Sequence, residues 1–303
     1  MSRAVEVAKV ADREKTAQRL LKSSADKFYD PDVDIDWAAP IVEGKYFQPE
    51  HRISLYGTYL WDRLSPEQRI ELGRHEIASV ASNGIWFELL LMQMLVNEVY
   101  SKDPTTNHVR YALTEIADEC RHSTMFSKAI ERLGVPAYGP RRITHVLGRL
   151  LPIIGYGPAL YGSVLVVEEL LDRLQREAMA DENVQPIIRM VNRIHVLEEA
   201  RHVTFARQEV VAGMPKLSRT ELAYQRWLIA QVALHVTHTL VNPKVYRSVG
   251  LDPQEAYSVA MRSPHYHESI RWAGERIMSF LDDAGLVGAP GMHAWRRSFL
   301  VAR

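Results

Sequence analysis

DECRH at residues 118–122 and EEARH at residues 198–202 are nearly the same five-residue phrase, repeated 80 positions along the chain. In each phrase an acidic residue precedes a glutamate, and an arginine precedes a histidine. The same shift of 80 positions pairs Glu88 with Glu168 further upstream. Because the sequence between these positions is not alike, the repeat indicates duplicated chemistry around which the packing residues are free to differ.

Helical signals surround both phrases and run through nearly the whole chain. SPEQ at residues 65–68 and SRTE at residues 218–221 are typical of capping boxes at helix starts. The sequence shows no convincing alternating strand pattern and no convincing Asn-Gly hairpin. We therefore predict an all-α protein, a ferritin-like bundle with helices at residues 65–100, 106–133, 158–180, 186–213, 218–241, 253–262 and 265–283.

The predicted helices suggest how the chain is organised. We expect a single domain over residues 1–303, in which a four-helix metal-binding core occupies residues 65–213. Residues 1–64 would form an N-terminal helix followed by an irregular arm on the surface, and residues 214–303 would add C-terminal helices.

The spacing of the glutamates sets their heights on these helices. Glu88 and Glu119 are 31 positions apart, and so are Glu168 and Glu199. In each case the chain runs outward and back through two arms of ~20 Å, at about 1.5 Å per residue. Each glutamate pair therefore lies at one level of an antiparallel helix pair.

A histidine joins each second glutamate on its helix face. Glu119 precedes His122 by three residues and Glu199 precedes His202 by three, and this spacing places both side chains one turn apart on one face. Two such hairpins facing each other would bring four glutamates and two histidines to one point. The alternative, in which both faces occur by coincidence, needs two independent matches.

This set of side chains predicts a dinuclear metal site of the kind found in ferritin-like bundles. Four buried carboxylates are costly in a medium of low dielectric constant unless cations compensate them, and two divalent cations would do so. Imidazole and carboxylate ligands suit iron or manganese, whereas structural zinc sites usually include thiolates. We expect two iron ions per chain, with manganese as the alternative metal.

The two halves differ at one informative position. The shift of 80 aligns Glu115 with His195, and His195 follows the i, i+4, i+7 pattern with Glu199 and His202. His195 is therefore either a third imidazole ligand, which would make the two metals inequivalent, or a neighbour of the site. Glu115 is a candidate for the surroundings of the site in the first half.

The acidic residues that precede the two glutamates have two interpretations. Asp118 and Glu198 lie four residues before His122 and His202, so they could accept hydrogen bonds from the imidazoles and fix their tautomers. The other interpretation is that they form solvent-facing salt bridges with nearby arginines.

Composition excludes several function classes. The chain has 303 residues, of which 47% are hydrophobic, and its formal net charge is zero, so nucleic acids and anionic membranes are poor partners. Cys120 is the only cysteine, which excludes an intrachain disulfide and fits a reducing compartment. The start, MSRAVEVAKVADREK, has no apolar run of a signal peptide, so we expect a cytoplasmic protein.

One apolar stretch is long enough to be considered as a membrane span. Residues 150–167 carry no charge and approach the roughly 18 residues that a spanning helix needs. However, Pro152, Gly155, Gly157 and Pro158 interrupt their first half. We therefore predict a loop that leads into a buried helix, and no membrane span.

The ordered set of a Glu, an ExxH, a second Glu and an H-x3-E-x2-H resembles the p-aminobenzoate N-oxygenase family of diiron arylamine oxygenases. The resemblance covers roughly residues 85–205 and implies a ligand set of seven residues: Glu88, Glu119, His122, Glu168, His195, Glu199 and His202. It also implies a cytosolic homodimer that activates O2 and oxidises an aromatic amine towards a hydroxylamine or nitro product. The chain has no flavin or nicotinamide motif, so electrons would come from another protein or a small reductant.

Other readings of the same bundle stay open. A hydroxylase or desaturase of a carbon substrate is the enzymatic alternative, and an iron-handling ferroxidase is a further one. Arg271 or Arg276 could bind the carboxylate of an aromatic acid. The remaining candidates, for which we expect packing or surface roles, are Cys120, Glu169, His235, His238, His265 and His267.

Overall fold

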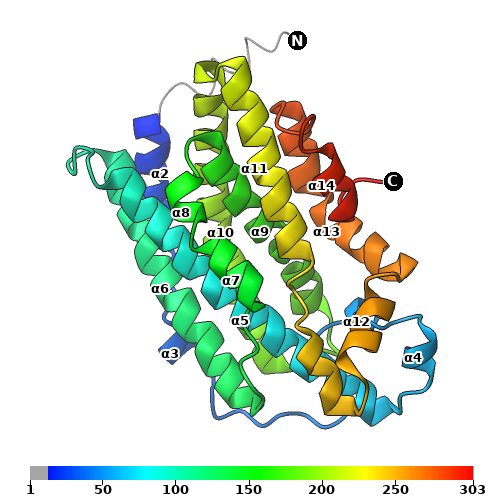
Figure 1. Ribbon diagram of the computed structural model, residues 1–303. Helices are drawn as coiled ribbons and strands as arrows, with labels where there is room; N and C mark the ends of the chain where they lie inside the picture. Colours follow the sequence, from blue (N-terminus) through cyan, green and yellow to red (C-terminus); the bar gives the residue numbers. More distant parts are fainter. Residues whose placement is uncertain (1–12, 303) are drawn as a thin grey trace.

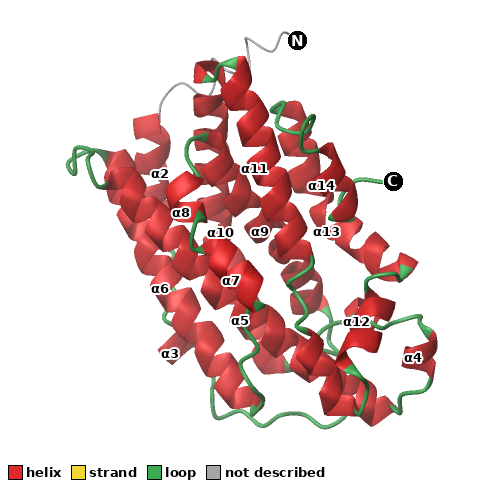
Figure 2. Cartoon of the chain, in the orientation of Figure 1, coloured by secondary structure: helices red, strands yellow, loops and turns green. Residues whose placement is uncertain are grey.

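A computed structural model describes residues 13–302 of the chain, and Figures 1 and 2 show that helices dominate this part. Within these residues no strand forms, and an isolated bridge joins Tyr46 to Val184. The prediction of an all-α, ferritin-like helical bundle is confirmed. The start of the chain, on which the expectation of no signal peptide depends, lies outside the described residues.

Four long helices build the core, and they match the predicted ranges closely. α5 packs against α6, and α9 packs against α10, so the chain forms two helical hairpins that also contact each other. The bounds are α5 Pro66–Val99, α6 Asn107–Leu133, α9 Pro158–Ala180 and α10 Pro186–Gly213.

Local signals in the sequence explain where these helices begin and end. Ser65 and Gln68 form the predicted capping box at the start of α5. α6 ends at Gly134, whose φ of 65° lies in the left-handed region that glycine adopts without strain. Short turns join α5 to α6 and α9 to α10, so the two helices of each hairpin lie side by side. The two glutamates of each hairpin therefore lie at one level.

The N-terminal helix α2 (Arg13–Asp26) packs against α6 and α10. The Glu14 carboxylate accepts hydrogen bonds from the backbone N–H groups of Asn107 and His108, at 2.8 and 3.2 Å. These are among the first N–H groups of α6, which have no partner inside the helix. α2 therefore caps α6 from outside as well as covering it.

The arm that follows α2 is more buried than the sequence predicts. It contains the short helices α3 (Pro31–Asp34), η1 (Glu50–Arg52) and α4 (Tyr59–Asp62). Ile53 and Leu55 are 1% and 0% exposed, so the expectation of a surface arm is wrong for this stretch. The stretch around Ile53 packs between α5 and the C-terminal part of the chain. The polar DPDVDID segment that precedes it led to the expectation of a surface arm.

The C-terminal helices form a second layer over the core. α11 (Arg219–Thr237) and α13 (Pro264–Asp283) both pack against α9, and α12 (Pro253–Ala260) lies at the end of the bundle. Ser218 and Glu221 form the predicted capping box at the start of α11. The sequence analysis missed η3 (Pro243–Val249) and α14 (Met292–Arg297), which are short. The single-domain organisation stays a prediction.

The connection between α6 and α9 contains two short helices, α7 (Arg142–Gly148) and α8 (Leu151–Ile154). The uncharged residues 150–167 include α8 and run into the buried first half of α9. By length and composition alone, α5 is the one described helix that could cross a membrane. Half of its most apolar window is buried against the rest of the protein, as in the core helix of a folded domain.

Candidate metal centre

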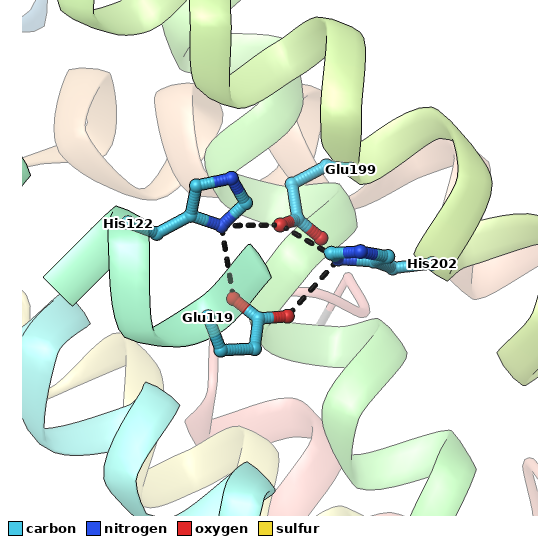
Figure 3. Close-up of side chains that lie close together, drawn as sticks. All are labelled: Glu119, His122, Glu199 and His202. Carbon is cyan, nitrogen blue, oxygen red and sulfur yellow. Dashed lines mark hydrogen bonds and ion pairs between the residues drawn. The ribbon is translucent and has the colours of Figure 1, made fainter. Parts of the chain in front are cut away.

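Both ExxH motifs point into the middle of the bundle and meet there (Figure 3). His122 Nδ1 lies 2.9 Å from Glu119 Oε2 and 3.1 Å from Glu199 Oε1. His202 Nδ1 lies 3.0 Å from both Glu119 Oε1 and Glu199 Oε1. α6 and α10 thus contribute one glutamate and one histidine each to a compact, fully buried group.

The two upstream glutamates join this group from the other two helices. Glu88 on α5 falls with His122 and His195 into a set whose donor atoms lie within 4.8 Å of one another. Glu168 on α9 falls into a corresponding set with His195 and Glu199. Glu88 and Glu168 are 2% and 3% exposed, so the four glutamates related by the shift of 80 all lie in one buried cluster.

His195 also points into the cluster. Its Nε2 atom lies 3.6 Å from Glu88 Oε1 and 3.7 Å from Glu199 Oε1. Its Nδ1 atom lies 2.8 Å from the amide oxygen of Gln175. Since that oxygen only accepts, Nδ1 carries the proton and the lone pair of Nε2 faces the carboxylates.

Gln175 is a residue that the sequence analysis missed. It follows Glu168 by seven positions on α9, so both side chains lie on the same helix face. That spacing was readable in the sequence. The first half of the repeat offered no corresponding pair of residues, because Glu115, and not a histidine, occupies the position that matches His195.

The acidic residues beside the glutamates hold the imidazoles, and they do so across the bundle. Glu198 Oε2 lies 2.9 Å from Nε2 of His122, and Asp118 Oδ2 lies 3.1 Å from Nε2 of His202. Each carboxylate therefore accepts from the histidine of the other helix, and not from the one four residues along its own helix. Nε2 carries the proton in both rings, which leaves Nδ1 to face the cluster.

Two arginines lie beside these acceptors, so Asp118 and Glu198 also form salt bridges, although not the solvent-facing ones of the second interpretation. Arg121 pairs with Asp118. Arg201 Nη2 lies 3.4 Å from Asp118 and 3.6 Å from Glu198. Asp118 and Glu198 are 3% and 0% exposed, so these ion pairs are buried and not solvent-facing. Two carboxylates and two guanidinium groups balance in charge around the centre.

The glutamates and histidines enclosed by these ion pairs are not balanced in charge in the same way. Burial and the charges of Glu119, Glu168 and Glu199 raise the pKa of Glu88 well above its usual value. Burial alone would lower the pKa of His122, but hydrogen bonds to three glutamates raise it well above its usual value. Glu88 and His122 thus both favour their protonated forms, which is expected where negative charge is concentrated and suits a site for cations.

Several buried atoms in the cluster have no hydrogen-bond partner. These are Glu88 Oε2, Glu168 Oε2, Glu199 Oε2 and His195 Nε2. Burial lowers the pKa of His195 to about 4, so this ring is neutral and able to donate its lone pair. Unpartnered carboxylate oxygens and a neutral imidazole around one point fit the donor set of a di-iron or di-manganese site.

Glu115 lies at the edge of this cluster. It is 1% exposed, its Oε2 atom has no hydrogen-bond partner, and burial raises its pKa well above the usual value. It belongs to none of the described groups that could hold a metal ion. A buried glutamic acid in its protonated form is the arrangement that this environment favours.

The other candidates lie outside the cluster. Glu169 pairs with Arg207, with 2.8 Å between Nε and Oε1, which supports the choice of Glu168 as the inward residue. Cys120 is exposed, and its sulfur lies 3.4 Å from that of Met92. The imidazoles of three further histidines contact backbone carbonyls: His238, His265 and His267.

A cavity of about 70 Å³ adjoins the cluster on the side of the arm. All four core helices line it, each within about one turn of a cluster residue: Gly84, Phe126, Leu171 and Val191. Phe126 packs against the ring of His195, with 4.9 Å between centroids. Gln48 and Arg52 from the arm line its outer end. Arg271 and Arg276, the predicted carboxylate-binding arginines, are exposed and do not line it.

Comparisons with known proteins agree with this geometry. The family model described as p-aminobenzoate N-oxygenase AurF matches residues 10–285. The uncharacterized protein MT0908 of Mycobacterium tuberculosis is 32% identical over 314 residues, which covers 97% of this chain and 89% of the relative. The uncharacterized protein Mb0909 of Mycobacterium bovis is 32% identical over 228 residues, covering 72% of this chain and 66% of its own length.

Proposed function

This chain belongs to the p-aminobenzoate N-oxygenase family, and on that premise we propose that it is a non-haem diiron oxygenase that oxidises the nitrogen of an aromatic amine. The observation that carries the proposal is the convergence of four glutamates and three histidines on one buried point between the two helical hairpins. Buried carboxylates in this number need cations, and the absence of sulfur among the donors favours iron or manganese.

We propose seven ligands for two iron ions per chain, and the asymmetry between the halves supports two different metal environments. The ligands are Glu88, Glu119, His122, Glu168, His195, Glu199 and His202. One metal would take two imidazoles and the other would take one, since His195 has no histidine counterpart in the first half of the repeat.

When bound, the two iron ions would supply the electrons and open coordination positions for the reduction of O2. The protein contributes orientation and exclusion of water. Gln175 fixes the ring of His195, while Asp118 and Glu198 fix the other two imidazoles. The apolar walls of the adjacent cavity, among them Phe126, would hold the substrate in a water-poor space beside the metals.

The proposal includes further participants. Electrons would come from another protein or a small reductant, because the chain carries no flavin or nicotinamide motif. We propose a homodimer, because the family resemblance implies one and because Ile143, Val146 and Ile153 form an exposed apolar face on α7 and α8. We also propose a cytoplasmic location, which the family resemblance implies.

The size of the cavity bears on the alternative of a hydroxylase or desaturase. A cavity of roughly 150 Å³ accommodates benzene in another protein. The volume of about 70 Å³ beside this cluster is smaller, so even a single ring requires some of the lining side chains to move. A long acyl chain would require far more rearrangement, which favours a one-ring substrate. A ferroxidase would need no organic cavity at this position.

Single-turnover chemistry tests the proposal. The iron-loaded, reduced protein is mixed with O2 and a panel of one-ring arylamines, and the products are identified by mass spectrometry. We expect hydroxylamino, nitroso or nitro products whose new oxygen derives from labelled O2. If O2 is consumed but only a carbon substrate accelerates the decay of the oxidised site, the diiron assignment stands and the amine assignment is wrong.

A further inference from the structure

The cavity beside the metal cluster contains one formally charged lining residue, Arg52, at its outer end. Its uncharged polar lining residues are Gln48, Gln175 and Asn192, and the remaining lining residues are apolar. A negative charge at the outer end of a bound substrate must therefore be matched by Arg52 or left without a partner among the lining residues, which is unfavourable. The state of Arg52 thus bears directly on which substrates can bind.

Glu177 forms an ion pair with the guanidinium group of Arg52. Arg52 Nε lies 2.6 Å from Glu177 Oε2 and Nη2 lies 3.1 Å from Glu177 Oε1, which is a bidentate pair. Nη1 donates to Ser269 Oγ at 3.0 Å. The guanidinium carbon also lies 3.8 Å from the centroid of the Trp272 ring. All three nitrogens of Arg52 have partners, and the Glu177 carboxylate compensates the positive charge that would otherwise attract a substrate carboxylate.

The inner end of the cavity offers a neutral polar group. Asn192 precedes His195 by one turn on α10, lines the cavity and is only 5% exposed. The structure describes no hydrogen bond from its side-chain amide to any residue between 13 and 302. Gln175, the other inner polar residue, uses its oxygen to orient His195. A side-chain amide that lines the cavity near the cluster, and that uses none of its donors or acceptors on the described residues, is suited to hydrogen-bond an uncharged amine.

We propose that this protein binds uncharged, mainly apolar aromatic amines and rejects anionic aminobenzoates, because Glu177 neutralises Arg52 at the cavity mouth while Asn192 holds the amine near the metals. The inference rests on the proposed function and names the substrate class of the same site. Glu177 acts through Arg52 and is therefore a specificity-determining residue, not a catalytic one.

Two ligands of the same shape test the first part of the proposal. 4-Methylaniline and 4-aminobenzoate differ in a methyl group against a carboxylate, and their dissociation constants can be measured calorimetrically on the iron-loaded protein without O2. We expect 4-methylaniline to bind roughly tenfold or more tightly than 4-aminobenzoate. Equal affinities, or tighter binding of the acid, would overturn the inference.

Glu177→Gln then frees the positive charge of Arg52 while keeping the shape of the residue. We expect this variant to bind 4-aminobenzoate roughly tenfold more tightly than the wild type, with little change for 4-methylaniline. Glu275→Gln is the matched control, because Glu275 pairs with Arg173 at 2.7 Å, and Arg173, unlike Arg52, does not line the cavity. If both variants behave alike, Glu177 does not set the specificity. If Glu177→Gln does not fold, the wild-type comparison of the two ligands still decides.

Asn192→Leu tests the inner contact. We expect it to weaken the binding of 4-methylaniline but not that of p-xylene, which has the same shape without an amine. Equal losses for both ligands would mean that Asn192 only shapes the cavity, which contradicts its proposed role. These binding measurements do not depend on turnover. Thus N-oxygenation of 4-aminobenzoate together with tight binding of this acid would overturn the inference while leaving the proposed function intact.

Discussion

At the residue scale, the crossed contacts of Asp118 and Glu198 decide which imidazole nitrogen faces the four glutamates. Asp118 lies beside Glu119 in sequence but accepts from His202, and Glu198 lies beside Glu199 but accepts from His122. Each hairpin therefore orients the histidine of the other. A substitution at Asp118 or Glu198 should therefore change the orientation of the histidine on the opposite helix.

This arrangement makes a prediction about metal affinity. Asp118→Asn and Glu198→Gln remove the charge of the acceptor, and each should lower iron affinity about 10–100-fold because the imidazole becomes less basic and less well oriented. Titration against a competing chelator measures the affinity. Glu169→Gln is the control, since Glu169 is also buried and paired with an arginine but lies outside the cluster. Affinities equal to the wild type in both variants would refute the role of the crossed contacts.

The third histidine allows a second prediction at this scale. His195→Ala should keep the fold and most of the iron, because six other donors remain, but it should change the absorption spectrum of the iron-loaded protein and its reaction with O2. Glu119→Ala should lose iron outright, since Glu119 approaches both His122 and His202 and is fully buried. Iron content and optical spectra distinguish the two results. An unchanged spectrum in His195→Ala would show that this ring is not a ligand.

At the scale of the elements, the contact between the arm and α5 depends on a buried carboxyl group. Glu76 on α5 accepts hydrogen bonds from the backbone N–H of Ser54 at 3.1 Å and from Gln48 Nε2 at 3.0 Å. Burial raises the pKa of Glu76 to about 7, although these hydrogen bonds partly oppose the shift. This carboxyl group ties the outer end of the cavity to the helix that carries Glu88.

The raised pKa of Glu76 makes protein stability depend on pH. Between the unfolded value near 4.5 and the folded value near 7, the folded state binds more protons, so its contribution to stability falls as the pH rises through this window. At about 1.36 kcal/mol per pH unit the change amounts to roughly 3 kcal/mol. Denaturant titrations of wild type and Glu76→Gln should therefore diverge above pH 5, with the wild type losing stability relative to the variant. Parallel curves would contradict the shifted pKa.

At the scale of the whole molecule, the cluster joins donors from four helices, and its first and last residues, Glu88 and His202, are more than a hundred positions apart. A metal bound by donors from α5, α6, α9 and α10 binds the folded state and not the unfolded chain. Metal at about 100 times its dissociation constant would stabilise the fold by about 2.7 kcal/mol per site. We predict two iron ions per chain by elemental analysis, and a lower melting temperature after chelation. One metal per chain, or a melting temperature that chelation leaves unchanged, would contradict the dinuclear site.

The exposed apolar face of α7 and α8 leads to a prediction about assembly. Ile143 and Ile153 are 67% and 78% exposed, and they lie among other apolar side chains that a soluble surface rarely groups together. If this face is the homodimer contact, Ile143→Glu and Ile153→Glu should shift the protein from dimer to monomer in light scattering after size-exclusion chromatography. Val33→Glu is the control, because Val33 on α3 is 79% exposed but lies outside this face. A monomeric wild type would refute the dimer itself.

The sequence by itself determined the helices of the core and the residues that meet at their centre. The 3.6-residue period and the equal spacing of 31 positions fix the height and face of each glutamate, because a helix advances by a constant rise and rotation. Caps such as Ser65 and Gly134 mark the boundaries through local hydrogen bonding. These features depend on neighbours within a few residues, so they can be read without the fold.

Only the tertiary structure decided which side chains from different elements touch. The crossing of Asp118 to His202, the hydrogen bond of Gln175 to His195 and the pairing of Arg52 with Glu177 all join elements that local periodicity does not relate. The buried arm behaves in the same way, since its polar composition predicts a surface position. Such contacts depend on how helices pack across long loops, and the chain carries no local signal for that.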